Sequence, residues 1–341
     1  MAALPIAIQC AGLVTSVGLS APAACAAIRA KLKNPCETRF VDSIGEWIMA
    51  HEVPMDTPWR GLPRLAHMAA MAVEDCLRDV PRAEWSSIPL LLCVAEHDRP
   101  GRQEGLDDQL FLQLQQVLGV SFAAESAIVA HGRAGAGVAL LQARKLLHEQ
   151  RLPGVLIVAA DSLLNWPTLG HYERSGRLLT SHNSNGFMPG EGAGALLVGL
   201  PDGQPQLLCA GIGFGVEAAH IDSGEPLRAD GLVAAIRAAT DDAGCEMHDL
   251  DFRIADVSGE QYYFKEAALA LSRTMRRLKE DFDLWHPAEC TGEAGALSGI
   301  SQVAVADAAC RKAYAPGPNV LLHMANDAGQ RCAVVLAFGS A

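Results

Sequence analysis

The chain has few aromatic side chains, few charges and no paired cysteines. Aromatic residues make up 5% of its 341 residues, and charged residues make up 19%. Its ten cysteines are scattered and form no CxxC pair, which argues against a zinc ribbon and against a disulfide framework. We therefore expect most of them to be small, buried and reduced side chains of a cytoplasmic protein.

Basic runs and membrane-length apolar runs are also missing. With 39 acidic against 27 basic residues, the formal net charge is −12, so nucleic acids and anionic membranes are unsuitable partners. No apolar run is long enough to cross a bilayer. The first residues resemble a signal peptide, but they lack its positive start and are interrupted by Gly12, Thr15, Ser16 and Gly18. The sequence thus predicts a cytoplasmic location.

Apolar segments typical of buried strands alternate with segments of helical periodicity. The pattern predicts strands at residues 6–13, 88–95, 127–130, 154–160, 193–198, 207–211, 252–257, 320–324 and 333–338. It predicts helices at residues 22–32, 65–77, 106–118, 137–150, 230–243, 265–280 and 292–309, and a loop over residues 35–63. Several strands are apolar throughout, which indicates an α/β protein whose sheet is covered on both faces.

The order of strands and helices recurs along the chain. We therefore predict an N-terminal half at residues 1–204 and a C-terminal half at residues 205–341, packed as one compact body. The two sequences differ too much to establish a repeat from the residues alone.

A glycine-rich stretch, NGFMPGEGAGALL at residues 185–197, is the most specific feature of the sequence. Its four closely spaced glycines indicate a loop with close backbone approach, followed by a buried strand. With TGEAGALSGI at residues 291–300, it resembles the glycine-rich segments of β-ketoacyl synthases in the thiolase superfamily. That resemblance implies a thiolase-like α/β/α/β/α layered sandwich of two pseudo-repeated halves.

The catalytic residues of that family have no counterparts here. The resemblance places Gly132 in the slot of the nucleophilic cysteine, or His131 after a slip of one residue. Asp256 takes the slot of the first histidine, and Ala288 and Glu293 take those of the lysine and second histidine. No Cys, Ser or Thr occurs between residues 127 and 161, and the final glycine-rich loop is reduced to residues 326–330. The resemblance therefore implies a catalytically silent protein.

What remains at these positions allows two interpretations. If the fold is kept, Asp256 and Glu293 converge near Gly132 and His131, where they could act as acid and base or bind a cation with a histidine. Alternatively the acids are solvated or paired with Arg133 in a disused pocket.

In the family, the segment between the strands at 88 and 127 builds part of the dimer interface and acyl pocket. This segment is short here, which predicts a shallow pocket.

Four further residues are candidates for binding a ligand, namely His131, Cys290, Gly190 and Gly192. Cys290 could border the same pocket as a substitute nucleophile, although a buried inert thiol is the simpler interpretation. The sequence predicts neither a metal site nor a cofactor.

Three functions follow as hypotheses. The first is a silent ketosynthase homologue that acts by binding, either as a chain-length-factor-like partner of an active ketosynthase or as an adaptor. The adaptor hypothesis comes from a resemblance to stand-alone proteins found beside type VI secretion effector genes, favoured by DSLLN at 161–165 and GRLLT at 176–180. The second is a residual acyltransferase or hydrolase that uses Asp256, Glu293 and Cys290. The third is an acyl-chain or small-molecule binding protein.

The resemblance also implies partners. A homodimer is the default of the family, and a heterodimer with a related ketosynthase is the alternative. An acyl carrier protein or a secreted effector could bind as well. Acyl carrier proteins are acidic, so docking one would need a local basic patch on this acidic chain, such as Arg144 with Lys145 or the segment RTMRRLKE at 273–280.

Overall fold

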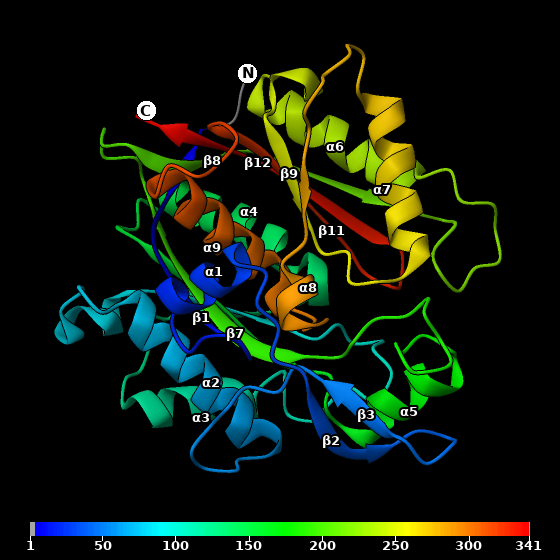
Figure 1. Cartoon of the computed structure of the whole chain (residues 1–341). Helices are drawn as coiled ribbons and strands as arrows, with labels where there is room; N and C mark the ends of the chain where they lie inside the picture. The colour runs from blue at the N-terminus through cyan, green and yellow to red at the C-terminus, as the bar shows by residue number, and fades with distance from the viewer. Residues whose placement is uncertain (1–3, 341) are drawn as a thin grey trace.

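Most strands of the chain join a single sheet. Within residues 4–340, which the computed structural model describes, ten strands form one mixed sheet in the order β10-β9-β11-β12-β8-β1-β7-β6-β4-β5, and β2 and β3 form a separate hairpin (Figure 1). The strands are β1 (Ile6–Val14), β2 (Cys36–Val41), β3 (Trp47–Ala50), β4 (Leu90–Val94), β5 (Ala127–Ala130), β6 (Val155–Ser162), β7 (Glu191–Gly199), β8 (Gln206–Val216), β9 (Phe252–Ala255), β10 (Leu284–Trp285), β11 (Asn319–Ala325) and β12 (Gln330–Gly339).

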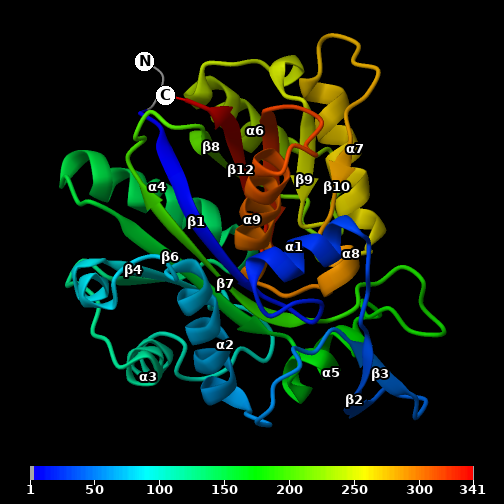
Figure 2. The same ribbon diagram turned by 60° about the vertical axis from the view of Figure 1, so that its left-hand side comes forward.

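Helices lie between the two ends of the sheet and on its outer faces. They are α1 (Ala21–Arg29), α2 (Gly61–Cys76), α3 (Gln109–Leu118), α4 (Gly135–Glu149), α5 (Trp166–Arg174), α6 (Asp230–Ala243), α7 (Gln261–Thr274), α8 (Ala288–Thr291) and α9 (Leu297–Arg311). Helices α4 and α9 pack against each other and against strands from both ends of the sheet (Figure 2). Helix α2 covers β1 and β7 with α3 outside it, while α6 covers β8 and β12 beside α7. The result is the five-layered α/β arrangement that the resemblance implied.

The strand order gives each part of the chain its own end of the sheet. Strands β1, β7, β6, β4 and β5 run from the centre to one edge, and β8, β12, β11, β9 and β10 run from the centre to the other. The first strand of each part, β1 or β8, lies at the centre of the sheet. A parallel pair lies at each edge, β4 with β5 at one and β9 with β10 at the other. This order supports the division of the chain at residues 204 and 205, which stays a proposal.

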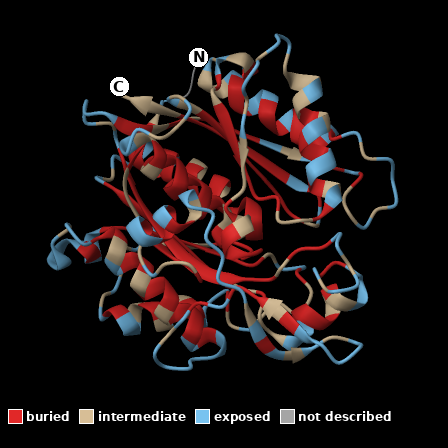
Figure 3. Ribbon diagram, viewed as in Figure 1, coloured by how far each residue is buried: buried red, intermediate tan, exposed pale blue. Residues whose placement is uncertain are grey.

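The core follows from the apolar runs. Strands β4 and β7 are buried along their whole length, because helices cover both of their faces (Figure 3). Helix α9 is also buried nearly all round, and it carries small residues along its length, as expected for a helix between two sheet layers. None of the helices in the described part of the chain has the length and apolarity that a membrane crossing needs.

Three sequence predictions differ from the structure. Residues 35–63 contain the β2–β3 hairpin rather than only loop, because its strands are short, polar and mostly exposed and so lack an apolar run. Helix α5 was missed because little of it is apolar, although Asn165 caps it and a proline occupies its first turn. The helix predicted at 292–309 begins only at Leu297, as α9, because Gly292 and Gly295 adopt positive φ angles, and the short helix α8 precedes these glycines.

The glycines of the 185–197 stretch allow close packing of backbone. A Cβ atom built on Gly192 would lie 2.5 Å from the carbonyl oxygen of Val14 and 2.6 Å from a methyl group of Leu297. One built on Gly190 would lie 2.4 Å from the carbonyl oxygen of Thr291. Neither glycine lines a cavity in the described part of the chain. Their contacts are with backbone and core side chains.

We expect Gly192→Ala to lower the free energy of unfolding by about 1–3 kcal/mol, because the added methyl group meets backbone that cannot yield. Gly154→Ala is the matched control, since its Cβ would make only ordinary contacts at 3.6 Å. That control should leave stability unchanged or raise it by about 0.4–1 kcal/mol. Urea unfolding of both variants measures the difference. Equal stability of the two variants would contradict the packing role of Gly192.

Candidate functional site

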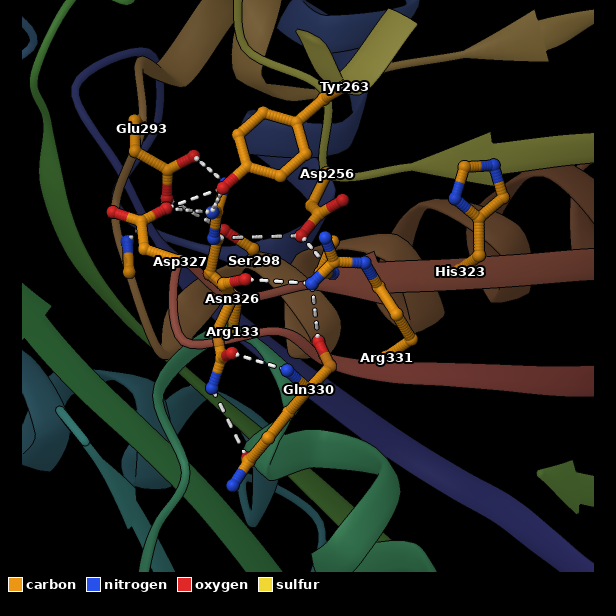
Figure 4. A network of polar contacts seen from close by, with 12 residues as sticks. Arg133, Asp256, Tyr263, Glu293, Ser298, His323, Asn326, Asp327, Gln330 and Arg331 are labelled. Atoms are coloured by element: carbon orange, nitrogen blue, oxygen red, sulfur yellow. Dashed lines mark hydrogen bonds and ion pairs between the residues drawn. The ribbon is translucent and has the colours of Figure 1, made fainter. Parts of the chain in front are cut away.

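Arg133 lies at the centre of the site that the sequence singled out. It belongs to the short turn Gly132–Ala134 between β5 and α4, and it is 7% exposed. Its guanidinium donates to Glu293 Oε2 at 3.2 Å, to Asp327 Oδ1 at 2.7 Å and to the Tyr263 hydroxyl at 2.7 Å (Figure 4). Its Nε lies 3.8 Å from Asp256 Oδ2. We call these five residues the Arg133 cluster.

A second arginine extends the network on one side. Arg177 pairs with Glu260 through two hydrogen bonds of 2.7 and 2.9 Å, and with Asp327 at 2.8 and 3.1 Å. Asp327 also accepts hydrogen bonds from the hydroxyls of Tyr263 and Tyr172. The Asp327 carboxylate therefore joins two buried guanidiniums and two phenols.

A third arginine closes the network on the other side. Arg331 is fully buried, pairs with Glu266 at 2.8 Å and donates to the carbonyl oxygen of Asn326 at 2.8 Å (Figure 4). The latter bond holds the loop that carries Asp327. His131 lies beside this loop, with Nδ1 3.2 Å from Gln330 Oε1, and does not enter the Arg133 cluster.

Gly132, which the resemblance places in the slot of the nucleophile, has no side chain and lies close to the carboxylate of Glu96. Gly132 has a φ of +50°, a conformation that favours glycine. A Cβ atom built there would lie 1.8 Å from Oε2 of Glu96. A cysteine or serine at this position would require Glu96 to move and would strain the backbone.

Side chains fill the space around the Arg133 cluster. Two cavities border it, with volumes of about 20 Å³ and about 10 Å³. Each is near the volume that one water molecule requires. The sequence predicted a shallow pocket because the segment between the strands at 88 and 127 is short. The structure shows a different reason for the small volume: the side chains of Arg133, Arg177 and Arg99 line the larger of the two cavities.

Negative charge exceeds positive charge in this buried network. Three guanidiniums, those of Arg133, Arg177 and Arg331, face five carboxylates: Asp256, Glu260, Glu266, Glu293 and Asp327. Burial raises the pKa of Glu293 to about 7, and burial likewise raises the pKa of Asp256. Burial opposes ionisation of Asp327 as well, but Arg133 and Arg177 together hold its pKa well below its usual value.

The structure brings together some of the predicted residues and separates others. Asp256 and Glu293 converge on the guanidinium of Arg133, as the second of the two interpretations has it. Ala288 lines the smallest cavity, next to Asp256. Cys290 does not border the cluster: it lines a different cavity on the other side of α8, and burial raises the pKa of its thiol. The expectation that Cys290 shares the pocket is therefore wrong.

No cation site is visible in this part of the molecule. Among residues 4–340, no three His, Cys, Asp or Glu side chains lie close enough together to hold a metal ion. The carboxylates of the cluster make hydrogen bonds to arginines, tyrosines and backbone N–H groups instead. These partners use the oxygens that a cation would need.

Sequence reasoning missed most of the network. Arg133 was considered only as a partner for the acids, and Tyr263, Asp327 and Arg331 were not considered. Two signals were present: Asp327 lies in the loop where the family has its last glycine-rich segment, and Arg177 lies in the GRLLT motif. Neither signal indicates which residues the side chains contact.

The basic patches proposed for an acidic partner are only partly available. Arg144 is buried and pairs with Asp242 at 2.7 Å, and Arg273 pairs with Asp230 at 2.7 Å. Arg276 and Arg277 are exposed in the loop after α7.

Comparison with known proteins identifies the fold. No protein-family model matches the sequence, and no curated protein matches it either. Among solved structures, the ishigamide ketosynthase/chain length factor matches with a TM-score of 0.78 at 17% identity, covering 99% of this chain and 100% of that chain. The ketosynthase ApeO in complex with its chain length factor ApeC from Xenorhabdus doucetiae matches with a TM-score of 0.79 at 14% identity, over 98% of both chains.

A third similar structure is AntDE:AntF, a type II PKS acyl-carrier protein in complex with its ketosynthase. It matches with a TM-score of 0.80 at 14% identity, covering 98% of this chain and 99% of that chain. Such identities establish a common fold and leave the chemistry to the residues of each chain. The chain therefore has the thiolase-like fold of ketosynthases and chain length factors.

We expect the excess of buried carboxylates to make stability depend on pH through Glu293. The folded chain keeps a proton on this carboxyl up to about pH 7, whereas the unfolded chain releases it near the ordinary pKa of 4.5. The stability that this proton provides is complete below pH 4.5 and is lost as the pH rises to 7. Relative to Glu293→Gln, the wild type should lose about 3 kcal/mol over this range in urea unfolding. Parallel pH profiles would contradict the raised pKa.

We expect Arg133→Met to lower the free energy of unfolding by about 3–5 kcal/mol, because it leaves buried carboxylates without their partner. Arg273→Met is the control, since Arg273 and Asp230 form an ion pair in which both side chains are exposed. The control should cost less than about 1 kcal/mol. Urea unfolding at neutral pH compares the two variants. A similar small loss in both would show that the cluster does not hold this part of the fold together.

Proposed function

We propose that this chain is a catalytically silent ketosynthase-fold protein that acts by binding, as the chain-length-factor-like partner of an active ketosynthase. The observation that carries the proposal is the state of the nucleophile slot. Gly132 supplies no nucleophile, and Glu96 occupies the position that a side chain would take. The Arg133 cluster fills the adjoining space with ion pairs rather than leaving room for an acyl chain.

The same geometry disfavours a residual acyltransferase or hydrolase. Asp256 and Glu293 both contact Arg133, and no substrate-sized cavity reaches either carboxylate among the described residues. Burial raises the pKa of Cys290, which lowers the fraction of reactive thiolate. Cys290 also lines a different cavity from the two that border the acids.

An interface for a partner is available at one edge of the sheet. Strand β5 is the last strand in its direction and has a hydrogen-bonded neighbour only in β4 within the described chain. An open edge of this kind can pair with a strand of another chain. Helix α3, which precedes β5, exposes Leu112 (56%) and Val117 (40%) to solvent. Exposed apolar side chains of this kind favour association with a second protein.

Two of the similar structures also support the choice of partner. The ishigamide and ApeO–ApeC structures are each of a ketosynthase together with a chain length factor. By analogy of fold, we infer a heterodimer in which this chain supplies no nucleophile. An acyl carrier protein would then bind chiefly to the active partner, because this chain has a net charge of −12.

We expect Leu112→Glu combined with Val117→Glu to weaken binding to a ketosynthase co-expressed from the same source at least tenfold, since two charges would enter an apolar interface. Leu278→Glu is the control: Leu278 is 96% exposed in the loop after α7, and its substitution should leave binding intact. Co-purification followed by a titration of the purified chains measures the effect.

Two outcomes would overturn the proposal. An acyl adduct on this chain after incubation with acyl thioesters, found by intact-mass spectrometry, would show that it retains a nucleophile. Capture of a secreted effector without any ketosynthase would instead favour the adaptor hypothesis. Retained ketosynthase binding by the double variant would place the interface away from α3.

A further inference from the structure

A second cavity, separate from the Arg133 cluster, lies beside the segment 284–290. A cavity of about 240 Å³ lies between α1, β10, α8 and α9, and none of its lining residues belongs to the cluster. The two views of the chain agree that α1 lies beside α8 (Figures 1 and 2). The residues that matter for its chemistry are Arg29, Lys31, Trp285, Cys290, Val305 and Tyr314.

Two aromatic rings form one wall of this cavity. The rings of Trp285 and Tyr314 are nearly parallel, with centroids 6.2 Å apart and an interplanar angle of 19°. Phe252 packs behind Trp285 with centroids 4.7 Å apart, which fixes the indole in place. Buried Val305 and Cys290 add apolar surface, since burial keeps the Cys290 thiol in its neutral form. This wall suits a flat apolar group.

Positive charge gathers at the mouth. The Arg29 guanidinium lies 4.2 Å from the centroid of the Tyr314 ring, and Lys31 also lines the cavity. Lys33 pairs with Glu289 at 3.1 Å at the same rim. Three cations thus stand against one carboxylate, on a chain whose net charge is −12. A local patch of positive charge beside an apolar cavity attracts an anionic ligand, even on a chain whose net charge is negative.

The charge and the volume limit the ligand. Because Lys33 is paired with Glu289, Arg29 and Lys31 are the cations left to match the carboxylate of a ligand. The volume lies below the roughly 300–1,000 Å³ of pockets that hold drug-sized molecules, so the ligand must be small.

We propose that this cavity binds a small aromatic carboxylate, with its rings against Trp285 and Tyr314 and its carboxylate on Arg29 and Lys31. The site is separate from the Arg133 cluster and does not rest on the proposed partner function. It lies on the opposite side of α8 from Ala288 and Glu293, which the sequence placed at the family's catalytic positions.

Isothermal titration calorimetry of the full chain with 2-naphthoate and with its neutral isostere 2-naphthamide tests the proposal. The wild type should bind one naphthoate per chain, about tenfold or more tightly than the amide, because a charged hydrogen bond is worth about 1.5–3 kcal/mol. Arg29→Gln combined with Lys31→Gln should remove most of this preference. Tyr314→Leu should weaken binding of both probes, since it removes half of the aromatic wall.

The matched control removes two exposed arginines elsewhere, by Arg276→Gln combined with Arg277→Gln, and should keep the full preference for naphthoate. Absence of naphthoate binding, or equal binding of acid and amide by the wild type, would overturn the proposal. An undiminished preference in the Arg29/Lys31 variant would place the anion site elsewhere and would overturn it as well. Because all variants change partly exposed side chains, their far-ultraviolet circular dichroism should match that of the wild type.

Discussion

The buried guanidinium of Arg133 is the group on which the centre of this molecule depends. It contacts carboxylates from three separate segments of the chain, the one after β9, the one before α9 and the loop between β11 and β12. Removing a charge from water costs several kcal/mol, so such a group persists only where its partners surround it. Here they do, and the segments that would otherwise border a substrate cavity are held against one another.

The first turn of α9 is held in place by the same kind of internal contact. The N-terminal turn of α9 would attract anions. In this chain its backbone N–H groups bind internal carboxylates: the Gly295 N–H donates to Glu293 and the Ala296 N–H to Asp161. Asp161 is in turn paired with buried Arg99. The positions that could stabilise negative charge on a substrate are therefore already filled by the protein itself.

Local patterns in the sequence were sufficient for much of the fold but not for the site. The strand at residues 127–130 and the helix at 230–243 were predicted with their observed bounds, because apolar runs and helical periodicity are properties of neighbouring residues. Contacts of Arg133 join residues 130, 160 and 194 positions apart, and no local pattern records them. Cys290 shows that closeness in sequence does not ensure contact. It is three positions from Glu293 but lies on the other side of α8, because α8 and Gly292, which has a positive φ angle, turn the chain between them.

The excess of buried carboxylates is the feature of the site that bears most directly on function. A network evolved only for stability would match each acid with a base, since unmatched buried acids raise their own pKa and weaken the fold at neutral pH. Here Asp256 and Glu293 have Arg133 between them as a shared partner. The Arg133 side chain thus fills space beside both carboxylates, and only small cavities remain there. The surface then offers the more suitable place for binding. The open sheet edge at β5 is the part of that surface that a strand of a second chain can extend.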